Sequence, residues 1–390
     1  MPHLSQRARR MPASPIRKLV PYAEEAKRRG IKVFHLNIGQ PDIPTPKVML
    51  DAYRNHNLTV LEYSHSAGTW EYREGLARYY QSYDIPVTKE EIIVTTAGSE
   101  ALIFAMMAVL DPGDEIIVPE PFYTNYNGFA VEAGATVVPV TCRAEEDFRL
   151  PPDAAIEARI TERTRAILIC NPNNPTGYLY SLAELERIRD LAVKHDLFII
   201  SDEVYREIVF DGEKHHSLLH LKGIEDRVIV VDSISKRYSA CGARVGCLVS
   251  KNPQVLETAL RFGQARLSPP TMEQLAALAA LETPASYFEE VVQEYQQRRD
   301  VVYEALSRIP GVVGPKPRGA FYTIVKLPVD NAEKFCTWLL SEFQDNGETV
   351  MLAPANGFYA TPGLGEDEVR IAFVLNTTAM KRCMEILEKA

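Results

Sequence analysis

The sequence predicts an α/β protein with a mostly parallel, seven-stranded sheet in a large domain and a smaller α+β domain after it. Short apolar runs rich in β-branched residues recur along the chain, and several are continuous rather than alternating, as in strands buried on both faces. Helical stretches lie between the runs, and strands that alternate with helices favour a parallel sheet covered on both sides. The expected strands are residues 92–96, 115–119, 136–140, 166–170, 197–201, 228–232 and 246–249.

The segments between these runs have helical periodicity. Residues 181–195, for example, place Leu185 and Ile188 on one face, as an amphipathic helix packed on a sheet does. After residue 284 the order changes: a long charged helix over 287–309 precedes two strand-like runs with a helix between them. We therefore expect an N-terminal arm and part of the small domain at 1–46, a large domain at 47–280 and a small C-terminal domain at 281–390.

Composition excludes several classes of protein. With 46% hydrophobic and 24% charged residues among 390, the chain should fold around a core, and its net charge of −9 argues against a nucleic-acid binder. No apolar stretch reaches the roughly 18–20 residues that span a bilayer, and the first ten residues do not resemble a signal peptide. The six cysteines form no Cys-x-x-Cys pair, which fits a reducing cytoplasm. We expect a cytoplasmic protein with no membrane or nucleic-acid partner.

Two of the expected strands end in turns that suit a phosphate or a ring. Ligands of open parallel sheets bind beyond the carboxyl ends of the strands. Gly98 and Ser99 follow the run 92–96 at the start of an apolar helix, where free N–H groups favour a phosphate, although an ordinary capped helix has the same pattern. After 166–170 comes NPNNPTG, a rigid turn in which Asn174 can present its amide to a ligand.

Two further strands end in charged residues. Asp202 follows the run 197–201, where a carboxylate needs a partner such as a protonated ring nitrogen, an arginine or a helix N-terminus. Lys236 follows 228–232 in a crowded, cation-rich segment, and an amine in such a site is a good nucleophile. An amine, a phosphate site, a ring-nitrogen partner and a ring-oxygen donor at one sheet edge are what pyridoxal 5′-phosphate requires.

With its motifs in the order in which they occur, the sequence resembles the class I/II aminotransferases of fold type I, the aspartate aminotransferase-like family. The resemblance extends over nearly the whole chain. The matching segments are LNIGQPD at 36–42, AGSEA at 97–101, NPNNPTG at 171–177, SDEVY at 201–205, 233–246 and VRI at 369–371, with Tyr63 and 67–68. The resemblance implies the fold of pyridoxal-phosphate-dependent transferases. It also implies ping-pong transfer of an amino group between an L-amino acid and a 2-oxo acid.

The resemblance also implies roles for individual residues. Lys236 corresponds to the Schiff-base lysine, which later carries a proton, and Asp202 would keep the pyridine nitrogen protonated. Asn174 and Tyr205 would bond the phenolic oxygen of the ring, and Tyr123 would stack on its face. Lys236, Asp202 and Tyr205 are thus the expected catalytic residues.

Other residues would hold the phosphate and the substrate. The substrate α-carboxylate would be gripped by Arg370, whose guanidinium fork matches a carboxylate. Tyr63 would reach the phosphate of a neighbouring subunit, which implies a homodimer with shared sites. The remaining phosphate ligands would be Gly98, Ser99, the Glu100 amide, Ser233 and Arg244, while Gly39 and Asn174 would assist Arg370.

The preferred amino acid follows less directly. Aspartate or glutamate is the expected donor, but the position at which the family's dicarboxylate branch has an arginine falls on Gly263. Arg266 and Arg17 are the candidates to replace it. Transfer from aromatic or other neutral amino acids, and a β-lyase that cleaves C–S bonds with the same cofactor, stay open.

Rival chemistries fit the sequence less well. Ser233-Ile234-Ser235-Lys236 matches the Ser-x-x-Lys motif of acyl hydrolases, but no Lys-Thr-Gly accompanies it. His216 and His220 have helical spacing, but no glutamate follows the first histidine, so we expect no metal site.

Overall fold

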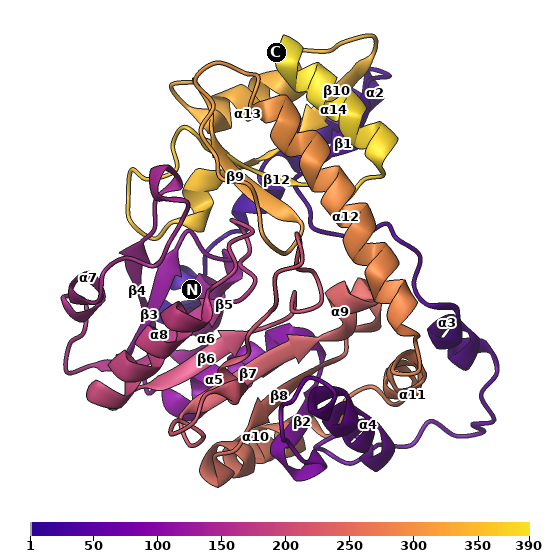
Figure 1. Ribbon diagram of the computed structural model, residues 1–390, viewed down its shortest axis with the longest axis vertical. Coiled ribbons are helices and arrows are strands. Elements are labelled where there is room, and N and C mark those ends of the chain that lie inside the picture. The colour runs from indigo at the N-terminus through magenta and orange to yellow at the C-terminus, as the bar shows by residue number, and fades with distance from the viewer. Residues whose placement is uncertain (1) are drawn as a thin grey trace.

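The computed structural model describes residues 2–390 and has a seven-stranded sheet at its centre (Figure 1). The strand order is β2-β8-β7-β6-β5-β3-β4. β8 pairs antiparallel with both β2 and β7, and all other pairs are parallel. The sheet is therefore mostly parallel, as predicted. Each strand begins and ends within two residues of its prediction. The strands are β2 (Ile92–Thr95), β3 (Glu115–Glu120), β4 (Thr136–Thr141), β5 (Thr164–Cys170), β6 (Phe198–Asp202), β7 (Val228–Ser233) and β8 (Gly246–Ser250).

Both faces of this sheet are covered, which explains the continuous apolar runs. Ile117 in β3 packs into one core, while its neighbours Ile116 and Val118 pack into the other. Helices α5 (Ala97–Val109) and α6 (Asn125–Ala133) contribute to the core on the side of Ile116, and α4 (Trp70–Gln81) and α8 (Leu182–Lys194) to the core on the side of Ile117. Burying each strand between two helical layers removes most of its apolar surface from water.

Local signals set the limits of some helices. The Ser181 hydroxyl accepts a hydrogen bond from the Glu184 N–H at 3.3 Å, and the Glu184 carboxylate accepts one from the Ser181 N–H at 2.9 Å. This capping box satisfies two backbone donors and begins α8. The other helices of this part are α3 (Lys47–Arg54), α7 (Asp153–Glu157), α9 (Ile234–Arg237), α10 (Pro253–Arg266) and α11 (Thr271–Ala280).

The last part of the chain forms smaller sheets. Figure 1 shows α12 (Ala285–Leu306) running from the large sheet to the far end of the molecule, where the C-terminal elements lie. There β11, β12 and β9 form an antiparallel sheet, and β1 (Lys32–His35) from the N-terminal segment pairs in parallel with β10. The domain limits at residues 46/47 and 280/281 stay a prediction. The elements here are β9 (Tyr322–Lys326), α13 (Ala332–Ser341), β10 (Glu348–Met351), β11 (Ala353–Pro354), β12 (Glu368–Ala372) and α14 (Thr377–Lys389), with α1 (Gln6–Arg10) and α2 (Val20–Arg28) near the N-terminus.

None of the helices within residues 2–390 is both long and apolar enough to cross a membrane.

Candidate active site

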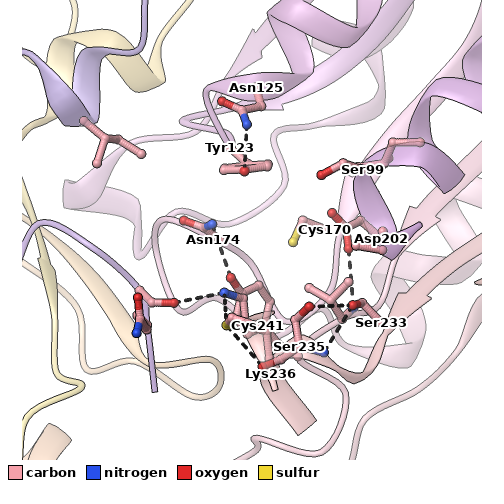
Figure 2. Close-up of a pocket in the computed structure, with 18 of the residues that line it drawn as sticks. Ser99, Tyr123, Asn125, Cys170, Asn174, Asp202, Ser233, Ser235, Lys236 and Cys241 are labelled. Atoms are coloured by element: carbon pink, nitrogen blue, oxygen red, sulfur yellow. Dashed lines mark hydrogen bonds between the residues drawn. The ribbon is translucent and has the colours of Figure 1, made fainter. Parts of the chain in front are cut away.

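The ends of β5, β6 and β7 and the start of α5 surround a cavity of about 410 Å³. Figure 2 shows Tyr123 and Asn125 on one side of this space and Lys236, Ser235 and Cys241 on the other. The fold thus brings strand ends that are far apart in the sequence to one edge of the sheet, as the sequence predicts. Of the predicted site residues, those that line the cavity are Gly39, Gly98, Ser99, Tyr123, Asn174, Asp202, Tyr205, Ser233, Lys236, Arg244 and Arg370.

Two predicted cofactor ligands do not line the cavity. The Glu100 carboxylate accepts hydrogen bonds from the Thr96 N–H at 2.7 Å and from Arg266 at 3.1 Å, so its side chain is engaged elsewhere. Tyr63 is 79% exposed. Its predicted role concerns the site of a second subunit.

Lys236 lies in α9, the helix that follows β7, with its amine in the cavity. Its Nζ donates to the Gly39 carbonyl oxygen at 2.9 Å and contacts Cys241 Sγ at 3.5 Å. Ser233 Oγ instead donates to the Val245 carbonyl oxygen at 2.9 Å, and it also lies 2.9 Å from Ser235 Oγ. No hydrogen bond therefore joins the lysine to Ser233, and the nucleophile–base pair of a Ser-x-x-Lys acyl hydrolase is not formed.

Asp202 ends β6 as a buried carboxylate with few donors. Tyr126 Oη donates to Asp202 Oδ2 at 2.7 Å, and the Val204 N–H lies 3.4 Å from Oδ1. Burial raises the pKa of Asp202 to about 6, and the hydrogen bond from Tyr126 opposes that rise. An anion held here without a cation suits a ligand that brings a protonated ring nitrogen. Sequence reasoning missed Tyr126, because only the packing of α6 gives it this partner.

Four side chains form a connected group on the opposite side of the cavity. Asn174 Nδ2 donates to Tyr205 Oη at 3.4 Å, and Tyr205 Oη lies 3.1 Å from Tyr322 Oη. Arg370 Nη1 donates to Asn174 Oδ1 at 3.0 Å. The two residues predicted to bond a ring oxygen therefore lie together. Tyr322, which the sequence analysis did not single out, belongs to the same group. Its ring centroid lies 4.6 Å from Arg370 Cζ.

Arg370 is a buried cation without a carboxylate partner. It is 2% exposed, its Nη2 donates to the Asn37 carbonyl oxygen at 2.6 Å, and its buried Nε has no partner. Burial lowers the pKa of this guanidinium, because the charged form is poorly solvated. A buried donor left unsatisfied is costly, and a bound carboxylate would satisfy it.

The start of α5 offers backbone donors to a phosphate. The helix begins at Ala97 with Thr96 as its N-cap, so Ser99 lies in the first turn and is not the cap. A Cβ on Gly246 would lie 2.5 Å from the Ala97 carbonyl carbon, which shows how closely β8 approaches this turn. Arg244 Nη1 donates to the Cys241 carbonyl oxygen at 3.0 Å beside the same cavity. Free N–H groups and an arginine together suit a dianion.

Of the two histidines with helical spacing, His220 uses both ring nitrogens in contacts with the backbone. His220 Nδ1 accepts from the Ser217 N–H at 3.1 Å, and its Nε2 lies 2.8 Å from the Tyr83 carbonyl oxygen. Among residues 2–390 no group of three potential metal ligands occurs.

Known proteins match this chain over nearly its full length. The profile of the family described as aminotransferase class I and II matches residues 31–387. The aspartate aminotransferase of Thermotoga maritima is 35% identical over 99% of this chain and 98% of its own. Aromatic-amino-acid aminotransferase 2 of Thermococcus litoralis is 32% identical over 99% of this chain and 97% of its own. The structure of a single mutant of Thermus thermophilus aspartate aminotransferase superimposes with a TM-score of 0.91 at 30% identity, covering 100% of both chains.

The cavity suits pyridoxal 5′-phosphate on three counts: a free lysine amine, a buried carboxylate without a cation, and a helix start with free donors. These features agree with the match of the family profile. The chain belongs to the class I and II aminotransferases and is a transaminase that depends on pyridoxal 5′-phosphate.

Proposed function

We propose that the chain transfers an amino group from aspartate or glutamate to a 2-oxo acid by ping-pong catalysis in the cavity around Lys236. One observation carries the proposal: the buried, partly unpaired guanidinium of Arg370 lines the same cavity as the amine of Lys236. A carboxylate bound by Arg370 places the amino acid at the lysine, and few other ligands would satisfy both groups.

When bound, pyridoxal 5′-phosphate supplies an aldehyde that condenses with amines and a ring that accepts the electron pair released at the substrate Cα. Lys236 would hold the cofactor through Nζ, and the same amine would accept the proton from the substrate Cα. Its contacts support this double role, since the Gly39 carbonyl and the Cys241 thiol orient the amine without forming an ion pair with it.

Other residues tune and position the ring. Asp202 would keep a proton on the ring nitrogen, because a buried carboxylate favours a protonated partner. Asn174 and Tyr205 would donate to the ring oxygen, and their mutual contact supports this role. Tyr123, which lines the same cavity, would stack on the ring face.

The start of α5 and groups near it would hold the phosphate of the cofactor. The proposed ligands are Gly98, Ser99, the Glu100 amide, Ser233 and Arg244. Arg370 then binds the α-carboxylate with Gly39 and Asn174, leaving the substrate Cα near Lys236.

The active form is proposed to be a homodimer in the cytoplasm. The exposed apolar residues Val60, Leu61 and Tyr63 are 65%, 67% and 79% exposed, which is a large apolar surface for one short segment. A second copy would cover it and bring Tyr63 to the neighbouring phosphate. Sedimentation of the holoenzyme tests this, and a monomer with full activity contradicts it.

Neutral or aromatic amino acids are the second candidate donors, because one relative, matched over 97% of its own length, is named for aromatic amino acids. A β-lyase reaction would instead give pyruvate, ammonia and a thiol, so product analysis separates it from transfer.

A screen of single half-reactions tests the proposal. The cofactor-loaded protein is mixed with one amino acid at a time, and the absorbance near 400 nm should fall fastest with aspartate or glutamate. Lys236→Ala should keep its circular dichroism and lose about 10⁴-fold or more of its rate, because it lacks both the amine and the proton carrier. A fully active Lys236→Ala variant contradicts the proposed role of the lysine.

A further inference from the structure

Four cations line the catalytic cavity, and only three have an assigned anion or reaction partner. The cations are Arg17, Lys236, Arg244 and Arg370, and the only carboxylate that lines the cavity is Asp202. In the proposed function, Arg244 faces the phosphate, Arg370 the α-carboxylate, and Lys236 the reacting carbon. Asp202 is paired with the ring nitrogen. Arg17 is the positive charge that remains.

Arg17 has no ion-pair partner among residues 2–390. The side chain is exposed, and none of the described carboxylates lies within 4.0 Å of it, although many surface arginines of this chain have such a partner. A free guanidinium at the mouth of a ligand cavity suits an anionic part of the ligand.

The segment that carries Arg17 is held firmly against the site. Pro15 packs on Gly357 so closely that a Cβ on that glycine would lie 2.3 Å from Pro15 Cβ. Ile16 packs against the cluster of apolar residues that includes Phe148 and Phe358. The backbone that leads into Arg17 is therefore held by the packing of the two residues before it.

A single residue connects this segment with the α-carboxylate site. Asn37 Nδ2 donates to the Ile16 carbonyl oxygen at 3.3 Å, and the carbonyl oxygen of Asn37 accepts from Arg370 Nη2 at 2.6 Å. Asn37 thus ties Arg370 to the backbone next to Arg17, and both arginines line one cavity. Two arginines held in this way can bind two carboxylates of one small molecule.

The other candidate arginine is engaged elsewhere. Arg266 Nη1 donates to Glu100 Oε2 at 3.1 Å and its Nη2 donates to the Ser66 carbonyl oxygen at 3.0 Å. Arg266 does not line the cavity. Its charge is neutralised inside the protein, so it does not select the substrate within this subunit.

We propose that Arg17 binds the side-chain carboxylate of a dicarboxylic amino acid while Arg370 binds its α-carboxylate. This inference rests on the proposed function and names the residue that sets its substrate class. Ile16 and Ile38 also line the cavity, so apolar side chains accompany the arginine there.

The test compares Arg17→Gln with the wild type on dicarboxylic and neutral substrates. For aspartate or glutamate, kcat/KM of the half-reaction should fall about 10- to 100-fold, the range expected for losing a charged hydrogen bond. For alanine or phenylalanine it should change by less than about 3-fold, because those side chains do not contact the arginine. Arg17→Lys should recover part of the loss. Arg143→Gln is the matched control, since Arg143 is also exposed but lies outside the cavity.

Binding of unreactive ligands gives a second readout. In calorimetry on the holoenzyme, succinate should bind less tightly to Arg17→Gln by a similar factor, while butyrate should bind equally to both proteins. Equal losses for dicarboxylic and neutral ligands, or no loss for either, would overturn the role of Arg17. A wild-type protein that reacts with neutral amino acids alone overturns the inference but leaves transamination intact. A wild-type protein that reacts with no amino acid overturns the proposed function itself.

Discussion

Tyr126 donates a 2.7 Å hydrogen bond to Asp202 and so joins α6 to the end of β6 at the cavity. The bond stabilises the ionised form of a carboxylate whose burial favours the neutral form. Since Asp202 must be ionised to pair with a protonated ring, Tyr126 is a positioning residue for the cofactor.

Tyr126→Phe should therefore move the pH dependence of cofactor affinity. Burial raises the pKa of Asp202 to about 6, and loss of the tyrosine donor raises it further. Because the carboxylate exists only above its pKa, the acid midpoint of pyridoxal 5′-phosphate binding should rise by about one pH unit. A titration of cofactor affinity against pH measures this. Tyr178→Phe, which removes a hydroxyl bonded to Glu184 away from the cavity, should leave the midpoint in place.

Asp202→Asn should stabilise the cofactor-free protein at neutral and alkaline pH. The pKa of Asp202 is raised from 3.8 to about 6 on folding, so the folded state holds a proton that the unfolded chain has released. Stability is therefore lost as pH rises through that window, by about 3 kcal/mol in total. An uncharged asparagine avoids this loss.

Denaturant unfolding of both cofactor-free proteins at pH 5 and pH 8 measures the effect, and the advantage of the variant should be larger at pH 8. With cofactor bound the order should reverse, because only the aspartate pairs with the ring. An advantage that does not change with pH would show that the gain has another origin.

Gly39→Ala should damage the α-carboxylate site. A Cβ at this position would lie 1.6 Å from Tyr322 Oη, and Tyr322 is buried against Tyr205 and Arg370. The tyrosine must move, which should cost about 1–3 kcal/mol of stability and lower kcat/KM at least about 10-fold. Unfolding curves and half-reaction rates measure the two effects. Gly242→Ala is the control, because a Cβ there meets no atom within 4 Å.

Cys241 should be the cysteine that reacts first with iodoacetamide. It is half-buried and lines the cavity, whereas the other five cysteines are buried. Its thiol also lies 3.5 Å from Lys236 Nζ, so the bound cofactor should shield it. Peptide mapping by mass spectrometry should find Cys241 labelled faster without cofactor than with it. Equal labelling in both states would contradict its placement beside the reacting amine.

The positions of the strands follow from local patterns. The seven apolar runs became the seven strands of the large sheet, and the polar segments after them meet at one edge because parallel strands end on the same side. This is why Lys236, Asp202 and Asn174 could be identified in the sequence. The likeness to the aminotransferases rests on the same ordered motifs.

Other partners depend on packing between distant segments. Tyr126 and Tyr322 carry no motif, and each acquires its contact only when its own element packs beside another. The sequence around Gly98 and Ser99 also fits an ordinary capped helix, whereas the helix begins at Ala97 with Thr96 as its N-cap. Glycine and serine permit either start, so the tertiary position of the backbone decides.

Arg17 and Arg266 are equivalent candidates in the sequence and differ only in the tertiary structure. The sequence alone determined that the predicted strands end in residues suited to bind an aldehyde cofactor. It also named two arginines that could bind the substrate side chain. Only the tertiary structure engages Arg266 with Glu100 and leaves Arg17 free on the cavity. The physical reason is that hydrophobic periodicity specifies which face of an element is buried, whereas an ion pair between residues 166 positions apart depends on how whole helices come to rest against each other.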